Sequence, residues 1–547
     1  MTTACLCLAL TLAGAQAPQT PAQTAPPDTA IIRGRVTGGD TGQPLRKAQV
    51  RLVPIGETGA TNVPGLTNRT ASTDADGKYE FKELPAGRYV VSASKGAYVS
   101  VTFGQPLQQM TAGGKPMDLR AGEMLERVDF TLPRGGVITG RVLDEFGEPL
   151  TGLQITAMRS QTVGGKRQLI RSGFGSTNDV GEFRMFGLAP GQYYVQAAWR
   201  RMGPGDPTSP DHTGYPLTFF PGTTIETEAQ RVTVAAGQTV SDLVMALSPV
   251  KTARVEGIVV DADGRPMGGV GLQVIQSSAG FNSMSGSSVR PDGTFVFANM
   301  SAGEYTFRTE PTATRQNVAM LKVTVGSEDI TDLRLVALPP ATVSGRIMID
   351  PSVTPPAAGF SLTASLEGQP MPGGMRPARV NDDLSFELTL LPGRNRISML
   401  NLPPGWAMRS LRVSSVDVID EGIDVKAGDT VSGVDVELTN RLASVSGLVT
   451  NSRGEAVKEY TLVLFAADSK RWKAGGRFLR TARPDQDGRF KVSGMPPADY
   501  CIIAIDTLEP GQWTDPEFLE RARSQARTLT IMDGETKTID LKIATAS

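Results

Sequence analysis

His212 is the single histidine in a chain of 547 residues, so metal binding or proton transfer by imidazole could involve only this one side chain. A zinc site built from two or three histidines cannot be assembled from it. His212 stands beside Asp211 in a polar loop, and no serine or cysteine lies in a recognisable nucleophile elbow. We therefore interpret His212 as a solvated loop residue, and we predict no catalytic residue, no metal and no cofactor.

Three Asp-x-Asp-Gly sequences, which begin at Asp74, Asp261 and Asp485, raise the question of a calcium site. An EF-hand loop carries a glutamate at its twelfth position, and counting from Asp74 that position is Pro85. Aspartate and glycine at this spacing are also typical of tight turns, because the carboxylate accepts hydrogen bonds from nearby backbone N–H groups. We interpret the three sequences as turns.

The tryptophans Trp199, Trp406, Trp472 and Trp513 are natural candidates for sugar binding, since an aromatic face offers apolar contact to a pyranose ring. Trp199 ends a predicted strand, and Tyr215 lies in the loop that follows it. Trp472 lies in a basic loop. We predict that Trp199, Tyr215 and Trp472 contact a ligand, with packing in a core or at a domain junction as the alternative for each.

Composition indicates a turn-rich protein of several domains. Gly (60) and Pro (38) are abundant, and 39% of the residues are hydrophobic, as in ordinary globular proteins. The 55 Lys and Arg residues balance 56 Asp and Glu residues, so no basic field exists to hold nucleic acid. We expect no nucleic-acid partner.

The N-terminus has the pattern of an export signal. An apolar run over residues 4–13 precedes Ala13-Gly14-Ala15, so residues 1–17 are predicted to be a signal peptide, with cleavage favoured after Ala15. Residues 18–30 are then a Pro/Ala/Thr-rich linker. Cys5 and Cys7 leave with the signal, and Cys501 alone cannot form an intrachain disulfide. We expect a secreted protein (periplasmic, cell-surface or extracellular) with no transmembrane segment in the mature chain.

An internal repeat organises the remaining residues. A strand-like sequence with a central glycine recurs five times and is followed each time by a polar turn and a second strand. These sequences are IIRGRV, VITGRV, RVEGIV, TVSGRI and SVSGLV, with the glycines Gly34, Gly140, Gly257, Gly345 and Gly447.

A second sequence pattern follows in each repeat and predicts a β-hairpin. A polar turn leads to a strand with aromatic and apolar residues in alternation, then to a turn with Gly87, Gly191 or Gly303. The return strand opens with a tyrosine whose ring is predicted to point inward. We expect these glycines and tyrosines to be structural. The tyrosines are Tyr89, Tyr193, Tyr305 and Tyr500.

The fourth repeat is degenerate, because Asn395 stands where the others have tyrosine. Helix is scarce, and the one good candidate covers Pro516 to Gln525, with Asp515 as N-cap. The repeats predict five β-sandwich units whose side chains alternate inward and outward at period 2. The predicted boundaries are 31–133, 134–250, 251–339, 340–440 (degenerate) and 441–547.

The combined pattern GRV…GxPL…TDxxGxYxFxxLPxGxYxV resembles the carboxypeptidase regulatory-like domain. The resemblance covers residues 31–310 strongly and 443–505 well. It implies an all-β fold, a tandem array of about five seven-stranded Ig/transthyretin-like β-sandwich domains. Similar modules occur in tandem in secreted bacterial proteins. The fold is often grouped with carbohydrate-binding-like sandwiches, and the pattern carries no catalytic residue, so it transfers none.

We therefore expect a secreted, non-enzymatic protein that binds extracellular carbohydrate. The alternative is a structural or protein-interaction stalk, adhesin-like or part of an envelope complex. The partners would accordingly be extracellular polysaccharide or envelope proteins. A glycoside hydrolase that uses only carboxylates is less favoured, because small sandwiches occupy every repeat and leave no larger catalytic domain.

Overall fold

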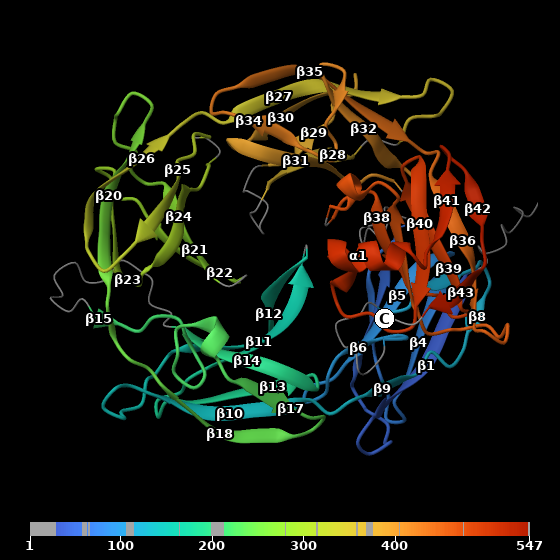
Figure 1. Cartoon of the computed structure of the whole chain (residues 1–547), viewed down its shortest axis with the longest axis horizontal. Coiled ribbons are helices and arrows are strands. Elements are labelled where there is room, and N and C mark those ends of the chain that lie inside the picture. The colour runs from blue at the N-terminus through green and yellow to red at the C-terminus, as the bar shows by residue number, and fades with distance from the viewer. Residues whose placement is uncertain are drawn as a thin grey trace, which may run out of the picture.

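The computed structural model describes most of the chain after the linker, and strands dominate it. Five units, each built around one repeat, follow one another around a ring, so that the fifth unit lies beside the first (Figure 1). The structure describes residues 29–544 except 57–62, 64–65, 106–113, 164, 199–212, 279–280, 313–315, 357–358, 368–375, 404 and 474. The predicted signal peptide and the predicted linker up to residue 28 lie outside these residues, and the first strand begins at Ala30, the last residue of the predicted linker.

The units share one plan of two packed sheets. In the first sheet the glycine strand is central, antiparallel to the first hairpin strand and parallel to the closing strand. In the second sheet the second strand of the repeat pairs with the tyrosine strand. The third unit shows the plan most simply, with three strands facing four. Its strands are β20 (Ala253–Asp261), β23 (Thr294–Met300) and β26 (Ile330–Ala337), then β21 (Gly271–Ser278), β22 (Phe281–Ser288), β24 (Gly303–Thr309) and β25 (Met320–Val325).

The first and second units follow this plan with short additional strands. In the first unit the sheets are β1 (Ala30–Gly38), β4 (Lys78–Leu84), β8 (Met124–Leu125) and β9 (Phe130–Leu132), then β2 (Gln49–Pro54), β3 (Arg69–Ser72), β5 (Gly87–Ser94), β6 (Val101–Thr102) and β7 (Met117–Leu119). In the second they are β10 (Gly136–Leu143), β13 (Glu182–Leu188) and β18 (Thr239–Ala246), then β11 (Gln154–Val163), β12 (Lys166–Ser176), β14 (Gly191–Ala198), β16 (Thr218–Phe219) and β17 (Arg231–Val234), with η1 (Glu226–Glu228) and the pair β15 (Thr213–Gly214) and β19 (Val250–Lys251).

The fourth unit widens its first sheet with two strands beyond the closing strand, β32 (Ala407–Val413) and β33 (Val416–Asp417). The other strands of that sheet are β27 (Ala341–Ile349), β30 (Ser385–Leu390) and the closing strand β35 (Thr430–Thr439). The second sheet contains β28 (Ser361–Leu366), β29 (Ala378–Arg379), β31 (Gly393–Leu400) and β34 (Ile423–Val425).

The fifth unit joins its two sheets through β43 (Leu541–Ala544), which pairs with strands of both. It also holds α1 (Pro516–Arg523), the α-helix of the described residues. The helix begins where the sequence predicts, with Asp515 accepting a hydrogen bond from the Glu517 N–H, and ends two residues early. The remaining elements are β36 (Ala443–Thr450), β37 (Thr461–Ala466), β38 (Leu479–Ala482), β39 (Arg489–Met495), β40 (Ala498–Ile505), β41 (Arg527–Ile531), β42 (Thr536–Thr538), η2 (Ser469–Arg471) and η3 (Gln512–Thr514).

The repeated glycine is explained by close packing against the closing segment. In every unit a methyl group on this glycine would overlap a backbone carbonyl oxygen of that segment, and in the first unit the oxygen belongs to Val128. In the second, third and fourth units the parallel pairing also shifts register at the glycine. Any larger residue would therefore force the two strands apart. The five positions are Gly34, Gly140, Gly257, Gly345 and Gly447.

The hairpin tyrosines lie in the unit cores, and each hydroxyl donates to the carbonyl oxygen four residues earlier. In the first unit the Tyr89 hydroxyl donates to Pro85 at 2.8 Å. Burial raises the pKa of all four phenols above the usual tyrosine value, so the hydroxyls stay protonated. The other three bonds run from Tyr193 to Ala189, from Tyr305 to Ser301 and from Tyr500 to Pro496.

The ring closes through polar contacts between the fifth and first units. Gln486 of the fifth unit donates to the backbone oxygen of Asp118 (3.2 Å) and accepts from its N–H (3.3 Å). Glu459 pairs with both Lys115 and Arg483, whose side chains are each only 9% exposed. The Glu459 carboxylate is itself 64% exposed, so two nearly buried cations share one carboxylate at the surface of this contact.

Candidate functional site

The ligand-contact residues predicted from the sequence do not form one group in the structure. Trp199 and His212 lie outside the described residues. Tyr215 is in the second unit, where it packs partly against the core and its hydroxyl donates to Glu145 at 2.9 Å. Trp472 is in the fifth unit. The two described aromatic residues thus belong to different units.

Trp472 is held by its own unit. Its indole N–H donates to the carbonyl oxygen of Ala466 at 2.7 Å. Its ring meets Phe465 edge-on, with centroids 5.5 Å apart, and the Arg523 guanidinium lies 4.8 Å from its centroid. The indole is thus partly buried and fixed by contacts within the fifth unit.

A hollow lined by Trp406 lies on the fourth unit, and we call it the Trp406 hollow. It measures about 400 Å³, within the usual range for small-ligand sites. Its floor is the outer face of the widened sheet, where Glu437 of β35 lies between Met348 of β27 and Ser410 of β32. The residues that line it include Met348, Asp350, Trp406, Arg412, Asp435 and Glu437.

The alternation of side chains along β35 places the carboxylates of Asp435 and Glu437 on the outer face of the sheet. Val434, Val436 and Leu438 of β35 are buried in the core, so Asp435 and Glu437 between them face outward. Asp435 lies opposite Arg412 of the added strand β32.

The polar groups of the hollow hold one another in place. Ser410 donates to Glu437 at 2.9 Å, and Arg409 and Arg412 pair with the same carboxylate at 3.4 and 3.7 Å. Arg409 also pairs with Asp533 of the fifth unit at 3.3 Å, which makes the hollow part of a junction between units.

At the rim, Asp350 accepts hydrogen bonds from the backbone N–H of Ser352 (2.9 Å) and from its hydroxyl (2.7 Å). These bonds, with the nearby Arg441 charge, hold the pKa of Asp350 below its ordinary value. The rim therefore keeps its negative charge in neutral solution.

The charges that line the hollow balance. Three carboxylates (Asp350, Asp435, Glu437) face three guanidinium groups (Arg409, Arg412, Arg441) around a partly buried indole. Fixed donors and acceptors beside an aromatic ring suit the hydroxyl groups and apolar ring face of an uncharged saccharide.

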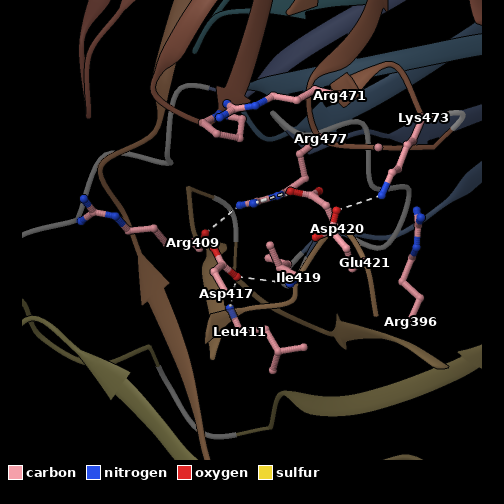
Figure 2. A network of polar contacts seen from close by, with 12 residues as sticks. Arg396, Arg409, Leu411, Asp417, Ile419, Asp420, Glu421, Arg471, Lys473 and Arg477 are labelled. Carbon is pink, nitrogen blue, oxygen red and sulfur yellow. Dashed lines mark hydrogen bonds and ion pairs between the residues drawn. The ribbon is translucent and has the colours of Figure 1, made fainter. Parts of the chain in front are cut away.

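The added segment of the fourth unit, which we define as residues 407–421 with the strands β32 and β33, also contacts the fifth unit (Figure 2). Arg477 donates to both carboxylate oxygens of Asp420, at 3.1 and 2.8 Å, and to the backbone oxygen of Arg409 at 2.6 Å. Lys473 pairs with Glu421 at 2.9 Å. The basic loop around Trp472, which the sequence suggested as exposed, contributes these two cations to the junction.

Sequence reasoning named Trp406 but did not place it in a site. A signal was present in one strand, because Asp435 and Glu437 alternate with buried residues, whereas Arg409 and Arg412 lie three residues apart and show no such alternation. The pairing of β32 with β35, which brings the two sets together, could not be read from either strand alone.

Comparison with known proteins identifies the start of the repeat array. Residues 31–133 match the family model of the carboxypeptidase regulatory-like domain. The matched residues are those of the first unit. A search of curated proteins found no match.

Among solved structures, the chain is similar to two pilins and to a Bacillus anthracis protein. The minor pilin GBS52 of Streptococcus agalactiae is 13% identical, covering 41% of this chain and 98% of its own, with a TM-score of 0.23. A streptococcal ancillary pilin is 11% identical over 57% of this chain and 99% of its own (TM-score 0.19). The Bacillus anthracis TIE protein is 11% identical over 77% and 76% (TM-score 0.15).

Two further observations concern the described residues alone. No group of three or more His, Cys, Asp or Glu side chains there is arranged to hold a metal ion. No helix there is long and apolar enough to cross a membrane.

Proposed function

We propose that the protein is a secreted, non-enzymatic binding protein and that its Trp406 hollow binds an uncharged saccharide of an extracellular polysaccharide. The observation that carries this proposal is the partly buried indole beside three carboxylates and three guanidinium groups of balanced charge. Balanced, mutually paired charges give hydrogen-bonding specificity without selecting a charged ligand.

The test is binding of neutral oligosaccharides (cello-, xylo-, manno- and chito-oligomers) to the mature chain. Trp406→Ala and Glu437→Gln are each expected to weaken binding about tenfold or more, by removing the ring face or a hydrogen-bonding charge. Trp513→Ala is the matched control, because Trp513 packs in the second core of the fifth unit, outside the hollow.

Melting temperature is measured for every variant, because Trp406 also packs against the core of the fourth unit. Glu437→Gln keeps the size of the side chain, so its binding loss cannot be ascribed to a cavity. The proposal is wrong if no neutral oligosaccharide binds, or if Glu437→Gln binds as the wild type does.

A protein-interaction or structural role is the second candidate, and exposed aromatic side chains on the second unit favour it. Phe146, Phe174 and Phe186 are 82%, 71% and 61% exposed. Large apolar side chains that remain in water are typical of surfaces that meet a protein partner. A pull-down from envelope extracts that is lost in the triple Phe→Ser variant, while sugar binding is kept, would favour this role.

Secretion is proposed from the N-terminal apolar run. N-terminal sequencing of the exported protein is expected to begin at residues 16–18. An intact Met1 on protein recovered from the cytosol would contradict export.

A further inference from the structure

A second hollow lies where the second and fifth units meet. It measures about 330 Å³ and is formed by the β11–β12 hairpin and strands β14 and β17 on one side, with Glu509 and Pro510 on the other. The two units are in close contact here, because a methyl group on Gly511 would overlap the backbone oxygen of Thr162. The hollow therefore exists only when these units are together.

Cations dominate this hollow. Arg159, Arg167 and Arg231 line it, and Glu509 is the one carboxylate among its lining residues. Within the described part of the chain, none of the three guanidinium groups forms an ion pair with a carboxylate. This differs from the Trp406 hollow, where positive and negative groups are equal in number.

Two of these arginines share one face of the sheet. Arg231 lies opposite Tyr194, which lies opposite Met158, and Arg167 lies opposite Thr162 on the same strand as Met158. Because Met158 and Thr162 are four residues apart on a strand, all these side chains are on one side. This is the side that the 509–510 segment meets.

The neighbours of Arg231 orient it and add further donors. Its Nε donates to the Tyr194 hydroxyl oxygen at 2.9 Å, and one terminal nitrogen donates to the Gln192 side-chain oxygen at 3.3 Å. Its guanidinium plane also lies 5.5 Å from the centre of the Tyr194 ring. With their oxygens accepting from Arg231, the Tyr194 O–H and the Gln192 amide N–H groups can donate to a ligand.

Arg159 is fixed at the edge of the hollow, where it donates to the Pro190 oxygen at 2.7 Å and lies over the Tyr193 ring. Only part of its donor set is used by these contacts, since a guanidinium group has five N–H donors. A hollow lined by donors and net positive charge, with guanidinium forks, is complementary to the oxygens of an oxoanion.

We infer that this hollow, at the contact between the second and fifth units, binds an oxoanion, either the carboxylate of an acidic saccharide or free phosphate. This site is separate from the Trp406 hollow and does not depend on it. Loss of saccharide binding in Trp406→Ala would therefore leave oxoanion binding intact.

The experiment titrates the mature full chain carrying Trp406→Ala, so that the Trp406 hollow does not contribute, by calorimetry with inorganic phosphate and, separately, with trigalacturonic acid; galactotriose is the uncharged control. At least one acidic probe is expected to bind and the uncharged one is not, and the probe that binds identifies the source of the anion. Arg167→Gln and Arg231→Gln are each expected to weaken that binding about tenfold or more.

Lys166→Gln is the matched control, because Lys166 is exposed on the same hairpin but does not line the hollow. It removes the same charge and is expected to leave binding unchanged within about twofold. Glu509→Gln tests the fifth unit, since removing the one lining carboxylate should strengthen anion binding severalfold.

Several outcomes would overturn the proposal. One is that neither acidic probe binds, and another is that galactotriose binds equally well. A third is that Lys166→Gln costs as much as Arg167→Gln, which would indicate general charge attraction. If Glu509→Gln leaves the affinity unchanged, the anion does not lie beside Glu509 and the assignment to this hollow is wrong.

Discussion

The fourth unit and the other four share a sandwich plan but differ in two places. Where the others bury a hairpin tyrosine, the fourth has Asn395, and its first sheet gains the strands β32 and β33. Asn395 is also buried, and its amide nitrogen donates to the oxygen of Leu391, four residues earlier, at 2.7 Å. The side chain at this turn therefore keeps a hydrogen bond to the carbonyl oxygen four residues earlier even where the aromatic ring is absent.

The added segment gives the fourth unit features that the repeat alone does not supply. Arg409 and Arg412 of β32 form the Trp406 hollow with β35, and Asp420, just beyond β33, pairs with the fifth unit. The fourth unit thus departs from the repeat in the segment that forms the Trp406 hollow and contacts the fifth unit.

The largest expected effect is the loss of stability when the hairpin tyrosine, which the fourth unit lacks, is truncated in another unit. Tyr89→Ala removes a fully buried aromatic side chain and its hydrogen bond to Pro85, and should lower the free energy of unfolding of the first unit by about 3–5 kcal/mol. Calorimetry should show this unit melting early while the others melt as before. Tyr98→Ala, a partly buried tyrosine of the same unit, is the control. A Tyr89→Ala variant with wild-type melting would contradict a packing role.

Asn395→Ala tests the retained hydrogen bond without a ring. It leaves the Leu391 and Gly393 oxygens without their amide donor, and should cost about 1–3 kcal/mol in the fourth unit. Chemical denaturation followed by Trp406 fluorescence measures it. A cost equal to that of Tyr89→Ala would mean that the hydrogen bond, and not the ring, supplies most of the stability at both positions.

Arg477→Ala tests the junction made by the added segment. Arg477 and Asp420 are about one-fifth exposed and doubly bonded, so the coupling in a double-mutant cycle with Asp420→Asn should be about 1 kcal/mol. The more exposed pair Lys473–Glu421 is the control and should give almost none. Equal coupling in both pairs would contradict the distinction.

The smallest expected effect concerns pH at the contact between the fifth and first units. Burial, with Asp118 and Asp487 nearby, raises the pKa of Asp485 above its ordinary value of 3.8. The folded state then favours the protonated form, so this contribution to stability is full below pH 3.8 and is lost as pH rises through the raised pKa.

Asp485→Asn should remove that loss, because an amide oxygen can still accept from the Asp487 and Arg489 N–H groups. Denaturation midpoints of variant and wild type should agree in acid and diverge, with the variant more stable, above the raised pKa. A midpoint difference that does not change with pH would contradict this titration.

The sequence predicted the all-β fold because each unit repeats a local pattern. Alternation around Tyr89 and the glycine at Gly34 are set by neighbours along one or two strands, and such patterns are visible in the chain itself. The start of α1 was predictable for the same reason, since Asp515 and Pro516 are local signals.

The candidate site was less accessible to prediction because it depends on contacts between distant segments. Trp406 faces charges from β35, and Arg409 reaches Asp533 of the next unit. Trp472 lies in a basic loop of the kind that is usually exposed, yet its indole contacts Ala466 and Arg523 of its own unit. Burial of a particular side chain is decided by which units touch, and the repeat pattern does not contain that information.

The contact between the fifth unit and the first two has a consequence for cleavage of the chain. In an open string of domains, one proteolytic cut between neighbours releases two independent fragments. Here the fifth unit touches the first through Gln486 and the second through Gly511, so a single cut in any connection leaves both fragments bound to each other. A nicked molecule would therefore run as two bands in denaturing gels while it elutes as one intact particle.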